Sequence, residues 1–166
     1  MSGGRRETMT MQTANDNIDY NMHEFVTAMI GGQLFGLPIR RVQDVFIPER
    51  VTRVPLAPPD IAGVLNLRGR IVTLIDMRLR LGLEPAETDG VRMAVGVEMR
   101  GESYGLLIDS VGEVLKFDGS YCERNPINLD PRLARVSTGI YRMEGQLLLV
   151  LDVDRVLDIV TQSAAA

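Results

Sequence analysis

Residues 32–46, with the sequence GQLFGLPIRRVQDVF, recur later in the chain as GESYGLLIDSVGEVL at residues 101–115. Six of the fifteen aligned positions are identical, at a constant offset of 69 residues. A second match follows in the same order, between GRIVTLID at residues 69–76 and GQLLLVLD at residues 145–152. Two matches in the same order indicate an internal duplication, and a repeat of this kind constrains the fold more strongly than any local pattern.

The two copies share one order of features. Each has a hairpin glycine, a strand with an internal glycine, a loop, a second hairpin glycine, an apolar strand and an aspartate before a short helix. Apolar runs rich in Val, Ile and Leu are typical of β-strands. Units of roughly 60 residues lie near the lower size limit for independent folding, so we expect them to share a core or exchange strands. The prediction is an all-β protein, mainly β with short helices, made of two small closed barrels. A single β-sandwich with accidental internal similarity is the alternative.

Short sequence patterns predict where turns and helices lie within the two repeats. Gly31-Gly32 and Arg100-Gly101 interrupt apolar runs and predict tight hairpin turns. Asp76 and Asp152 each precede a short helical pattern and are predicted N-caps. Asp60 is the predicted cap of one further helical turn in the sequence PPDIAGVL.

The polarity of the two ends separates them from the body. Residues 1–23 lack any periodic apolar pattern and are predicted to be a flexible N-terminal arm. Residues 24–160 form the predicted folded body with its two subdomains, and residues 161–166 a disordered tail. An alternative for the arm is a peptide that binds a partner through Tyr20 and Met22.

Composition excludes several classes of protein. The chain has 166 residues, 45% hydrophobic and 24% charged, with a net charge of -4, which disfavours nucleic acid as a partner. It contains no apolar run of the roughly 18 residues that a membrane span requires, so direct membrane insertion is not expected. Because the chain has a single cysteine, Cys122, and no export signal, we expect a cytoplasmic protein.

A search for catalytic chemistry finds little. The only histidine, His23, falls in the predicted arm, and Cys122 has no histidine near it in sequence. Asp152, Asp154 and Asp158 fit a helix cap and a solvated face better than a metal site. No phosphate-binding glycine loop is present. We therefore expect no catalytic residue, no cofactor and no metal, and a β-barrel hydrolase remains only a distant alternative.

The segment PPDIAGVLNLRGRIVTLIDMRLRLGL, residues 58–83, resembles the characteristic motif of the CheW family of chemotaxis coupling adaptors. The similarity extends from about residue 24 to residue 157 and includes FGLPIRRVQDVF, YGLLIDSVGEVL and GIYRMEGQLLLVLDVDRVL. The resemblance implies two intertwined SH3-like five-stranded β-barrels, which agrees with the duplication.

The resemblance also implies a function. CheW-like adaptors bind the regulatory domain of the histidine kinase CheA and the cytoplasmic tip of methyl-accepting chemoreceptors. Receptor occupancy then changes kinase activity through protein contacts alone. The expected location is the cytoplasm, with recruitment to receptor arrays at the inner face of the membrane, where self-association is also compatible with the family. The alternative is a CheW-like scaffold of a different chemosensory cluster, which controls surface behaviour or gene expression.

By the family's pattern, six residues occupy positions sensitive for partner binding. Arg68 is expected to form an ion pair with Asp44, either as an internal brace or beside a direct contact. Aspartate replaces the glutamate common at position 44, so a longer or water-bridged pair is one expectation. The full set of predicted partner-binding residues is Val42, Asp44, Gly63, Arg68, Met93 and Ala94.

Overall fold

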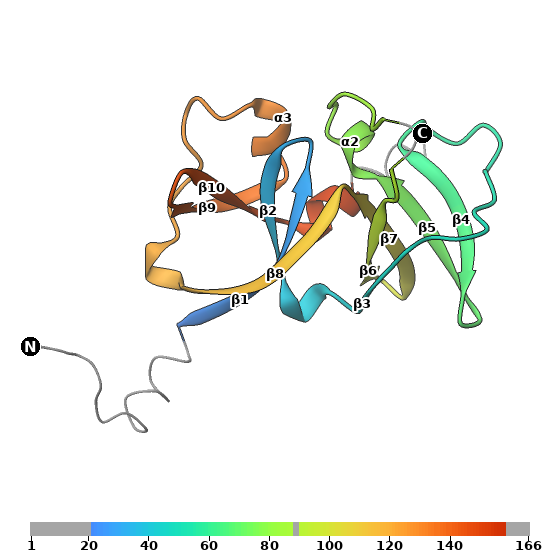
Figure 1. Cartoon of the computed structure of the whole chain (residues 1–166), viewed down its shortest axis with the longest axis horizontal. Coiled ribbons are helices and arrows are strands. Elements are labelled where there is room, and N and C mark those ends of the chain that lie inside the picture. The colour runs from blue at the N-terminus through green and yellow to red at the C-terminus, as the bar shows by residue number, and fades with distance from the viewer. Residues whose placement is uncertain (1–20, 88–89, 159–166) are drawn as a thin grey trace, which may run out of the picture.

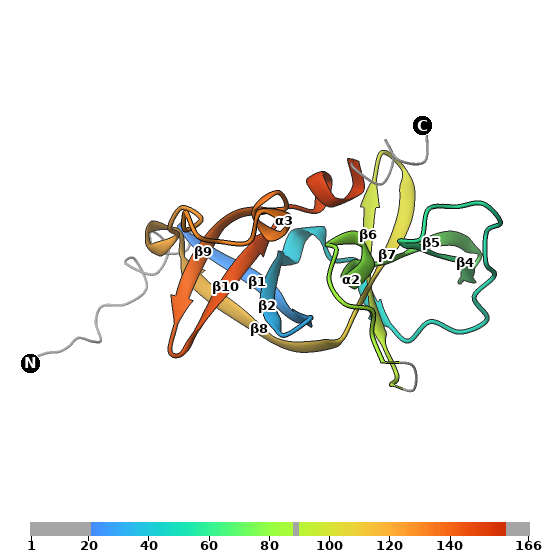
Figure 2. The same cartoon turned by 90° about the horizontal axis from the view of Figure 1, so that it is seen from above.

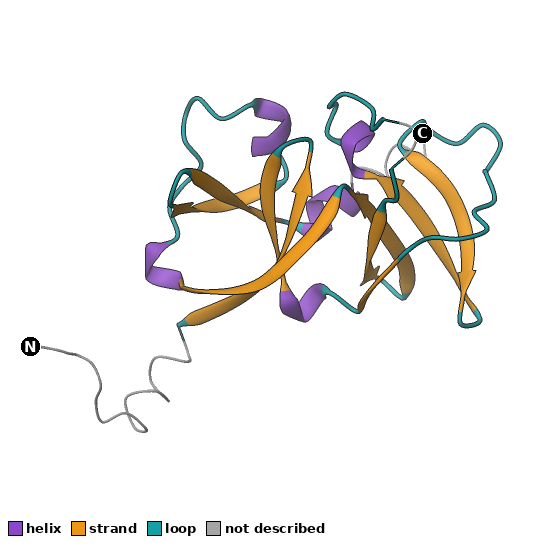
Figure 3. Cartoon of the chain, viewed as in Figure 1, coloured by secondary structure: helices purple, strands orange, loops and turns teal. Residues whose placement is uncertain are grey.

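The computed structural model describes residues 21–87 and 90–158, and strands dominate this part of the chain (Figures 1 and 3). The strands are β1 (Met22–Ile30), β2 (Gln33–Pro38), β3 (Asp44–Phe46), β4 (Ile61–Leu67), β5 (Arg70–Asp76), β6 (Met93–Met99), β7 (Glu102–Ile108), β8 (Ser110–Asp118), β9 (Ser137–Met143) and β10 (Gln146–Leu151). The short helices are η1 (Ile39–Arg41), α2 (Met77–Arg80), η2 (Gly119–Tyr121) and α3 (Pro131–Ala134), and residues 153–158 are also helical.

The strands form two five-stranded sheets, and each sheet takes strands from both repeats. The terminal sheet has the order β8-β1-β2-β10-β9, and the middle sheet has the order β3-β6-β7-β5-β4. Replacing every strand by its counterpart in the other repeat (β1 by β6, through to β5 by β10) converts one order into the other. Figure 1 shows the blue N-terminal strands beside the orange and red C-terminal ones in the terminal sheet. The predicted all-β fold class is therefore confirmed, with two five-stranded sheets that are intertwined by reciprocal strand exchange, which Figure 2 shows from above.

The equivalence of the two sheets holds residue by residue. Phe25 pairs with Pro38 between β1 and β2, and the counterpart Ala94 pairs with Leu107 between β6 and β7. The parallel pairs β2–β10 and β5–β7 also correspond, and each sheet has a register shift at the same place in its last hairpin. The duplication detected in the sequence is thus a duplication of strand register.

Three apolar clusters hold the sheets together. The largest packs residues of both sheets with the short helices, and its fully buried members include Phe35, Ile75, Leu106 and Leu149. A small cluster around Leu74 lies within the middle sheet, and another around Tyr141 lies within the terminal sheet. Since the largest cluster joins the two sheets, neither sheet completes its core alone.

The predicted turns and two of the three predicted caps are confirmed. Gly31-Gly32 and Arg100-Gly101 are two-residue turns in which both residues have positive φ, as hairpin turns that match strand twist require. Asp76 caps α2, where Leu79 N donates to its Oδ1 at 3.3 Å, and Asp152 accepts equivalently from Arg155 N at 3.1 Å.

The helical turn predicted after Asp60 is wrong. Ile61–Leu67 form β4, and the Ile61 amide donates to the Pro58 carbonyl in a turn. Pairing with β5 overrides the local capping signal there. Conversely, α3 was not predicted, although Asp130 and Pro131 are a typical cap and first residue of a helix.

The structure shifts the start of the body slightly. Strand β1 begins at Met22, and both Met22 and His23 pair with β8, so these two residues of the predicted arm belong to the terminal sheet. The remainder of the predicted arm before residue 21 and the predicted tail, residues 161–166, lie outside the described residues. Within the described residues, no helix is long and apolar enough to cross a membrane.

Candidate functional site

The motif Asn66-Leu67-Arg68-Gly69 builds the turn between β4 and β5. Arg68 has φ 53° and Gly69 has φ 83°, so both residues are left-handed, as in the two-residue turns described above. The Gly69 amide donates to Asn66 Oδ1 at 2.8 Å and fixes the turn from within. An arginine in this conformation costs about 1 kcal/mol relative to glycine. Arg68 is therefore less favourable in this turn than glycine would be, as is Arg100 in the β6–β7 turn.

The Arg68 side chain reaches the predicted partner. Arg68 Nη1 lies 3.2 Å from Asp44 Oδ2, so the ion pair is direct despite the short aspartate side chain. The Arg68 side chain is 72% exposed and that of Asp44 only 20% exposed. Asp44 is therefore held against the sheet, while the guanidinium group stays accessible to a partner.

Gly63 allows a close chain crossing. Its φ is 150°, and a Cβ at this position would lie 2.5 Å from the Thr52 carbonyl oxygen. Thr52 forms a two-bond bridge with Val64, which draws the loop after β3 onto β4. In the terminal sheet Gly139 holds the equivalent position, beneath a bridge between Glu123 and Ile140. The structure thus gives Gly63 a packing function, and its part in partner binding stays a prediction.

The other predicted site residues lie on or beside β3 and β6. Ala94 is fully buried and pairs with Phe46. Its side chain therefore cannot contact a partner directly, and a substitution there would affect binding only by shifting the residues around it. Met93 and Val42 are half-buried and pack against the largest core cluster. Of the six predicted residues, the structure brings Asp44 and Arg68 into direct contact and exposes mainly Arg68.

Exposed apolar side chains around the middle sheet were not predicted. Ile47, Val51 and Val91 line a cavity of about 350 Å³ whose floor includes Leu74 and Leu107. Further exposed apolar residues lie in the loop after β3 and on β5. The exposed apolar residues of this region, with the exposed fraction of each, are Ile47 (52%), Val51 (40%), Val54 (42%), Leu56 (104%), Ile71 (63%) and Val91 (73%). Contiguous exposed apolar surface, such as that of Ile47, Val51 and Val91 around the cavity, is a feature of interaction sites. The alternation of RIVTLID was a usable signal for Ile71, because it puts alternate residues on the outer face.

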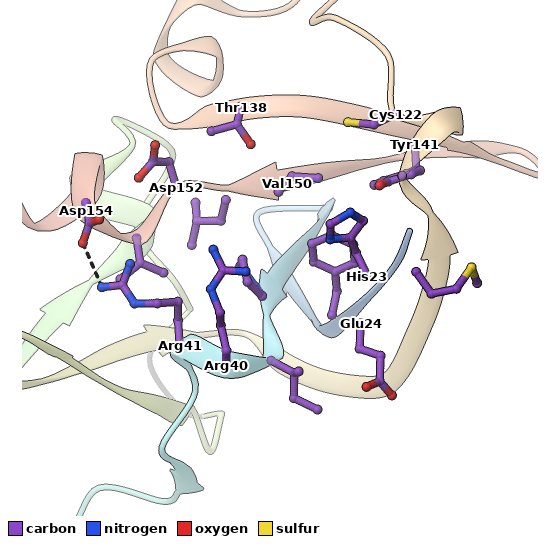
Figure 4. A pocket seen from close by; sticks show the side chains of 17 residues that line it. His23, Glu24, Arg40, Arg41, Cys122, Thr138, Tyr141, Val150, Asp152 and Asp154 are labelled. Atoms are coloured by element: carbon purple, nitrogen blue, oxygen red, sulfur yellow. Dashed lines mark hydrogen bonds and ion pairs between the residues drawn. The ribbon is translucent and has the colours of Figure 1, made fainter. Parts of the chain in front are cut away.

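A second, larger cavity of about 590 Å³ opens in the terminal sheet (Figure 4). Phe25, Tyr141 and Val150 contribute its apolar surface. Its polar lining includes the side chains of His23, Glu24, Arg40, Arg41, Cys122, Thr138, Asp152 and Asp154. Burial raises the pKa of Tyr141 to about 12, so its phenol stays neutral at physiological pH.

One ion pair clamps the two sheets together. Arg78 of α2 binds Asp109 in a bidentate manner, with Nε–Oδ1 and Nη2–Oδ2 distances of 2.9 and 2.8 Å. Asp109 also accepts from the Gly31 amide at 2.8 Å. Burial raises the pKa of Asp109, but the hydrogen bonds from Arg78 and Gly31 outweigh it and hold that pKa below the ordinary value. The clamp thus fixes the middle sheet against the β1–β2 turn of the terminal sheet.

The described residues contain no group of three or more His, Cys, Asp or Glu side chains placed to hold a metal ion. His23 lies on β1 and Cys122 is exposed beside η2. The features of this surface are an accessible arginine, exposed apolar residues and two cavities. Together with the duplicated sheets, they define a two-lobed β protein whose exposed surface suits contacts with other proteins.

Comparison with known proteins agrees with this class and makes it specific. Residues 24–160 match the family model of the CheW-like domain, so the chain belongs to the CheW family of chemotaxis scaffold proteins.

Curated relatives match the chain over most of their own length. It is 26% identical to the probable chemotaxis protein CheW of Rhizobium etli, over 94% of this chain and 100% of the relative. It is 29% identical to the chemotaxis protein CheW of Bacillus subtilis, over 81% of this chain and 86% of the relative. Among solved structures, the scaffolding protein TtCheW of Thermoanaerobacter tengcongensis matches with a TM-score of 0.70 and 27% identity, covering 78% of this chain and 88% of that one.

Proposed function

We propose that this protein is a non-catalytic adaptor that couples chemoreceptors to the histidine kinase CheA by binding the kinase regulatory domain and the receptor's cytoplasmic tip. The observation that carries the proposal is the Arg68–Asp44 pair. The family motif is kept, although it forces an arginine into a left-handed turn, and the guanidinium group is exposed. Arginine is enriched in protein interfaces and among the residues that contribute most to binding.

The apolar residues of the loop after β3 supply the remainder of the proposed contact. Leu56 is fully exposed and has φ 65°, a conformation unfavourable for leucine. Together with the cavity beside Ile47 and Val51, it offers apolar area that a partner's side chains would remove from water. We place the proposed contact on the middle sheet, with Arg68 at the β4–β5 turn and the cavity toward the other end of the same two strands, and expect a cytoplasmic protein recruited to receptor arrays.

The test is quantitative binding of the full chain to the CheA regulatory domain and to a receptor cytoplasmic fragment from the same organism. Micromolar binding to both supports the proposal, and an Arg68→Gln variant should bind at least one of them about tenfold more weakly. Arg70→Gln is the matched control, because it removes an exposed arginine from the start of β5. Binding to neither partner would overturn the proposed coupling and favour a scaffold of a different chemosensory cluster.

A further inference from the structure

The cavity of the terminal sheet has a counterpart in the middle sheet, because the two sheets are equivalent. The two offsets of the duplication, 69 and 76 residues, convert one set of lining residues into the other. Met22, Pro38 and Val150 line the cavity of the terminal sheet, and their counterparts Val91, Leu107 and Leu74 line that of the middle sheet. The two cavities are therefore the same structural position in the two halves of the molecule.

In the middle sheet an arginine occupies this position. Arg92 precedes β6 and binds Asp76, the N-cap of α2, in a bidentate manner, with distances of 2.9 Å from Nη1 to Oδ2 and 3.1 Å from Nη2 to Oδ1. The side chains of Arg92 and Asp76 are only 19% and 14% exposed. Asp76 thus carries out two tasks at once, capping a helix and holding a guanidinium group.

In the terminal sheet the carboxylate is retained but the arginine is not. Asp152, the counterpart of Asp76, caps the helix at residues 153–158 in the same way. The counterpart of Arg92 is His23, whose side chain is shorter, and both His23 and Asp152 line the cavity of about 590 Å³ (Figure 4). The Arg155 side chain lies 3.3 Å from Asp152 Oδ2, but it is 53% exposed and comes from the solvent side of the same helix. A pair this exposed contributes little and is readily exchanged.

We propose that this cavity binds an arginine side chain of a partner protein, with the Asp152 carboxylate accepting the guanidinium hydrogen bonds as Asp76 accepts those of Arg92. The less buried apolar lining residues, Met22, Pro38 and Ile39, offer apolar surface to the methylene stem of the incoming arginine. The planar guanidinium group fits a carboxylate with two parallel hydrogen bonds, which a lysine ammonium group does not. The proposal goes beyond the adaptor function, since it concerns a site on the other sheet and names the chemistry of its ligand.

An arginine ligand would have to replace Arg155, whose Nε lies 3.3 Å from Asp152 Oδ2 and whose Nη1 also donates to the Ser137 carbonyl at 3.5 Å. The lining contains three carboxylates, those of Glu24, Asp152 and Asp154, and two guanidinium groups, those of Arg40 and Arg41. Arg41 is already bound to Asp154 at 2.8 Å and donates to the Glu98 carbonyl. Arg40 in the lining and Arg155 beside Asp152 are the like charges that an incoming arginine would meet, and both are exposed to solvent.

The first test is a titration of the isotopically labelled full chain with N-acetyl-L-arginine methylamide, followed through backbone amide chemical shifts. Saturable shifts confined to the residues around the cavity, among them His23, Thr138 and Asp152, are the expected result. The corresponding lysine compound should bind more weakly. Shifts that stay linear in probe concentration, or that scatter over the acidic surface, would overturn the proposal.

Three variants decide which groups hold the probe. Asp152→Asn should weaken probe binding about tenfold, and because asparagine also caps helices the fold should survive. Asp158→Asn removes the same charge from the same helix outside the cavity, and it should leave binding unchanged. Arg40→Gln should strengthen binding, because it removes a like charge. Loss of binding in Arg40→Gln would mean that Arg40 itself holds the probe, through the probe's amide carbonyls, and it would refute the proposal.

A fourth variant tests the internal comparison without any ligand. His23→Arg places a guanidinium group at the position of Arg92, and it should bind Asp152 within the chain. We expect a higher Tm than that of the unsubstituted protein and complete loss of probe binding. A lower Tm together with unchanged probe binding would show that the two positions are not equivalent.

Discussion

Arg68 and Asp44 form a 3.2 Å ion pair between the two edges of the middle sheet. Asp44 begins β3, which is one edge strand, and Arg68 follows β4, which is the other. A flat five-stranded sheet would keep these edges about 19 Å apart, at about 4.8 Å per strand. The pair and the Thr52–Val64 bridge together show that the sheet curls strongly enough to bring its two edges within reach of these contacts. The ion pair thus spans the curl of the sheet and leaves the guanidinium group exposed.

Arg68→Asn should separate binding from stability. Asparagine tolerates the left-handed conformation better than arginine, and a surface ion pair contributes at most about 1 kcal/mol. We therefore expect a free energy of unfolding within about 1 kcal/mol of the unsubstituted value, with clearly weaker binding to the CheA regulatory domain or the receptor fragment. Urea unfolding and equilibrium binding measure the two quantities. A large loss of stability would instead assign Arg68 the function of an internal brace.

Gly63→Ala should be strongly destabilising. The new Cβ would meet the Thr52 carbonyl oxygen at 2.5 Å, and φ 150° is unfavourable for any residue with a side chain. We expect a loss of about 2–4 kcal/mol in the free energy of unfolding, measured by urea denaturation, from strain and disturbed packing.

Gly145→Ala is the matched control for Gly63→Ala. Gly145 has φ 80°, but no atom lies within 4 Å of the place that the new methyl group would take, so only the backbone cost of about 1 kcal/mol remains. Equal losses in the two variants would show that the crossing of Thr52 over Gly63 is not the cause.

The sequence predicted the strands and hairpins because these depend on local pattern and on the repeat. Gly31-Gly32, Arg100-Gly101 and the caps Asp76 and Asp152 all lie where short-range chemistry places them. The prediction of a helix cap at Asp60 was wrong because the residues after it form β4, which pairs with β5. The local sequence around Asp60 contains no indication of this pairing. Which strands exchange between the repeats is likewise a long-range property.

The part of the candidate site that belongs to the family motif could be predicted from the sequence. The pairing of Asp44 with Arg68 followed from the resemblance, and the structure contains it. The exposure of Leu56 and Ile71 and the burial of Ala94 depend on the curling of the sheet, so the sequence did not separate contact residues from core residues. The cavity beside His23 could not be predicted, because the polar sequence around that residue indicates an arm and gives no sign of its pairing with β8.

The Arg78–Asp109 clamp should make stability depend on acid pH. The folded pKa of Asp109 lies below its unfolded value of about 3.9, so the unfolded chain takes up the proton first as the pH falls. The clamp's contribution is therefore complete above this unfolded value and is lost as the pH drops through the lower, folded pKa.

Asp109→Asn measures this contribution. At pH 7 the variant should lose about 1–3 kcal/mol, because a bidentate charged pair and a bond to the Gly31 amide are weakened. The difference from the unsubstituted protein should shrink toward about pH 2, below the unfolded pKa, as seen by urea unfolding at several pH values. A difference independent of pH would assign the loss to packing. Asp158→Asn, at a more exposed ion pair, serves as the control for net charge.

Cutting the chain after Glu87 should abolish folding of both halves. The first fragment keeps β1–β5 and the second keeps β6–β10, yet each sheet needs strands from both. Each fragment alone would expose unpaired strand edges and half of the largest core cluster, so we expect no cooperative unfolding transition from either. An equimolar mixture, refolded together, should regain the circular dichroism spectrum and the transition of the intact chain at a lower, concentration-dependent Tm. The intact chain taken through the same refolding is the control. Cooperative unfolding of residues 1–87 alone would mean that the first repeat closes on itself and that strand exchange is not required for folding.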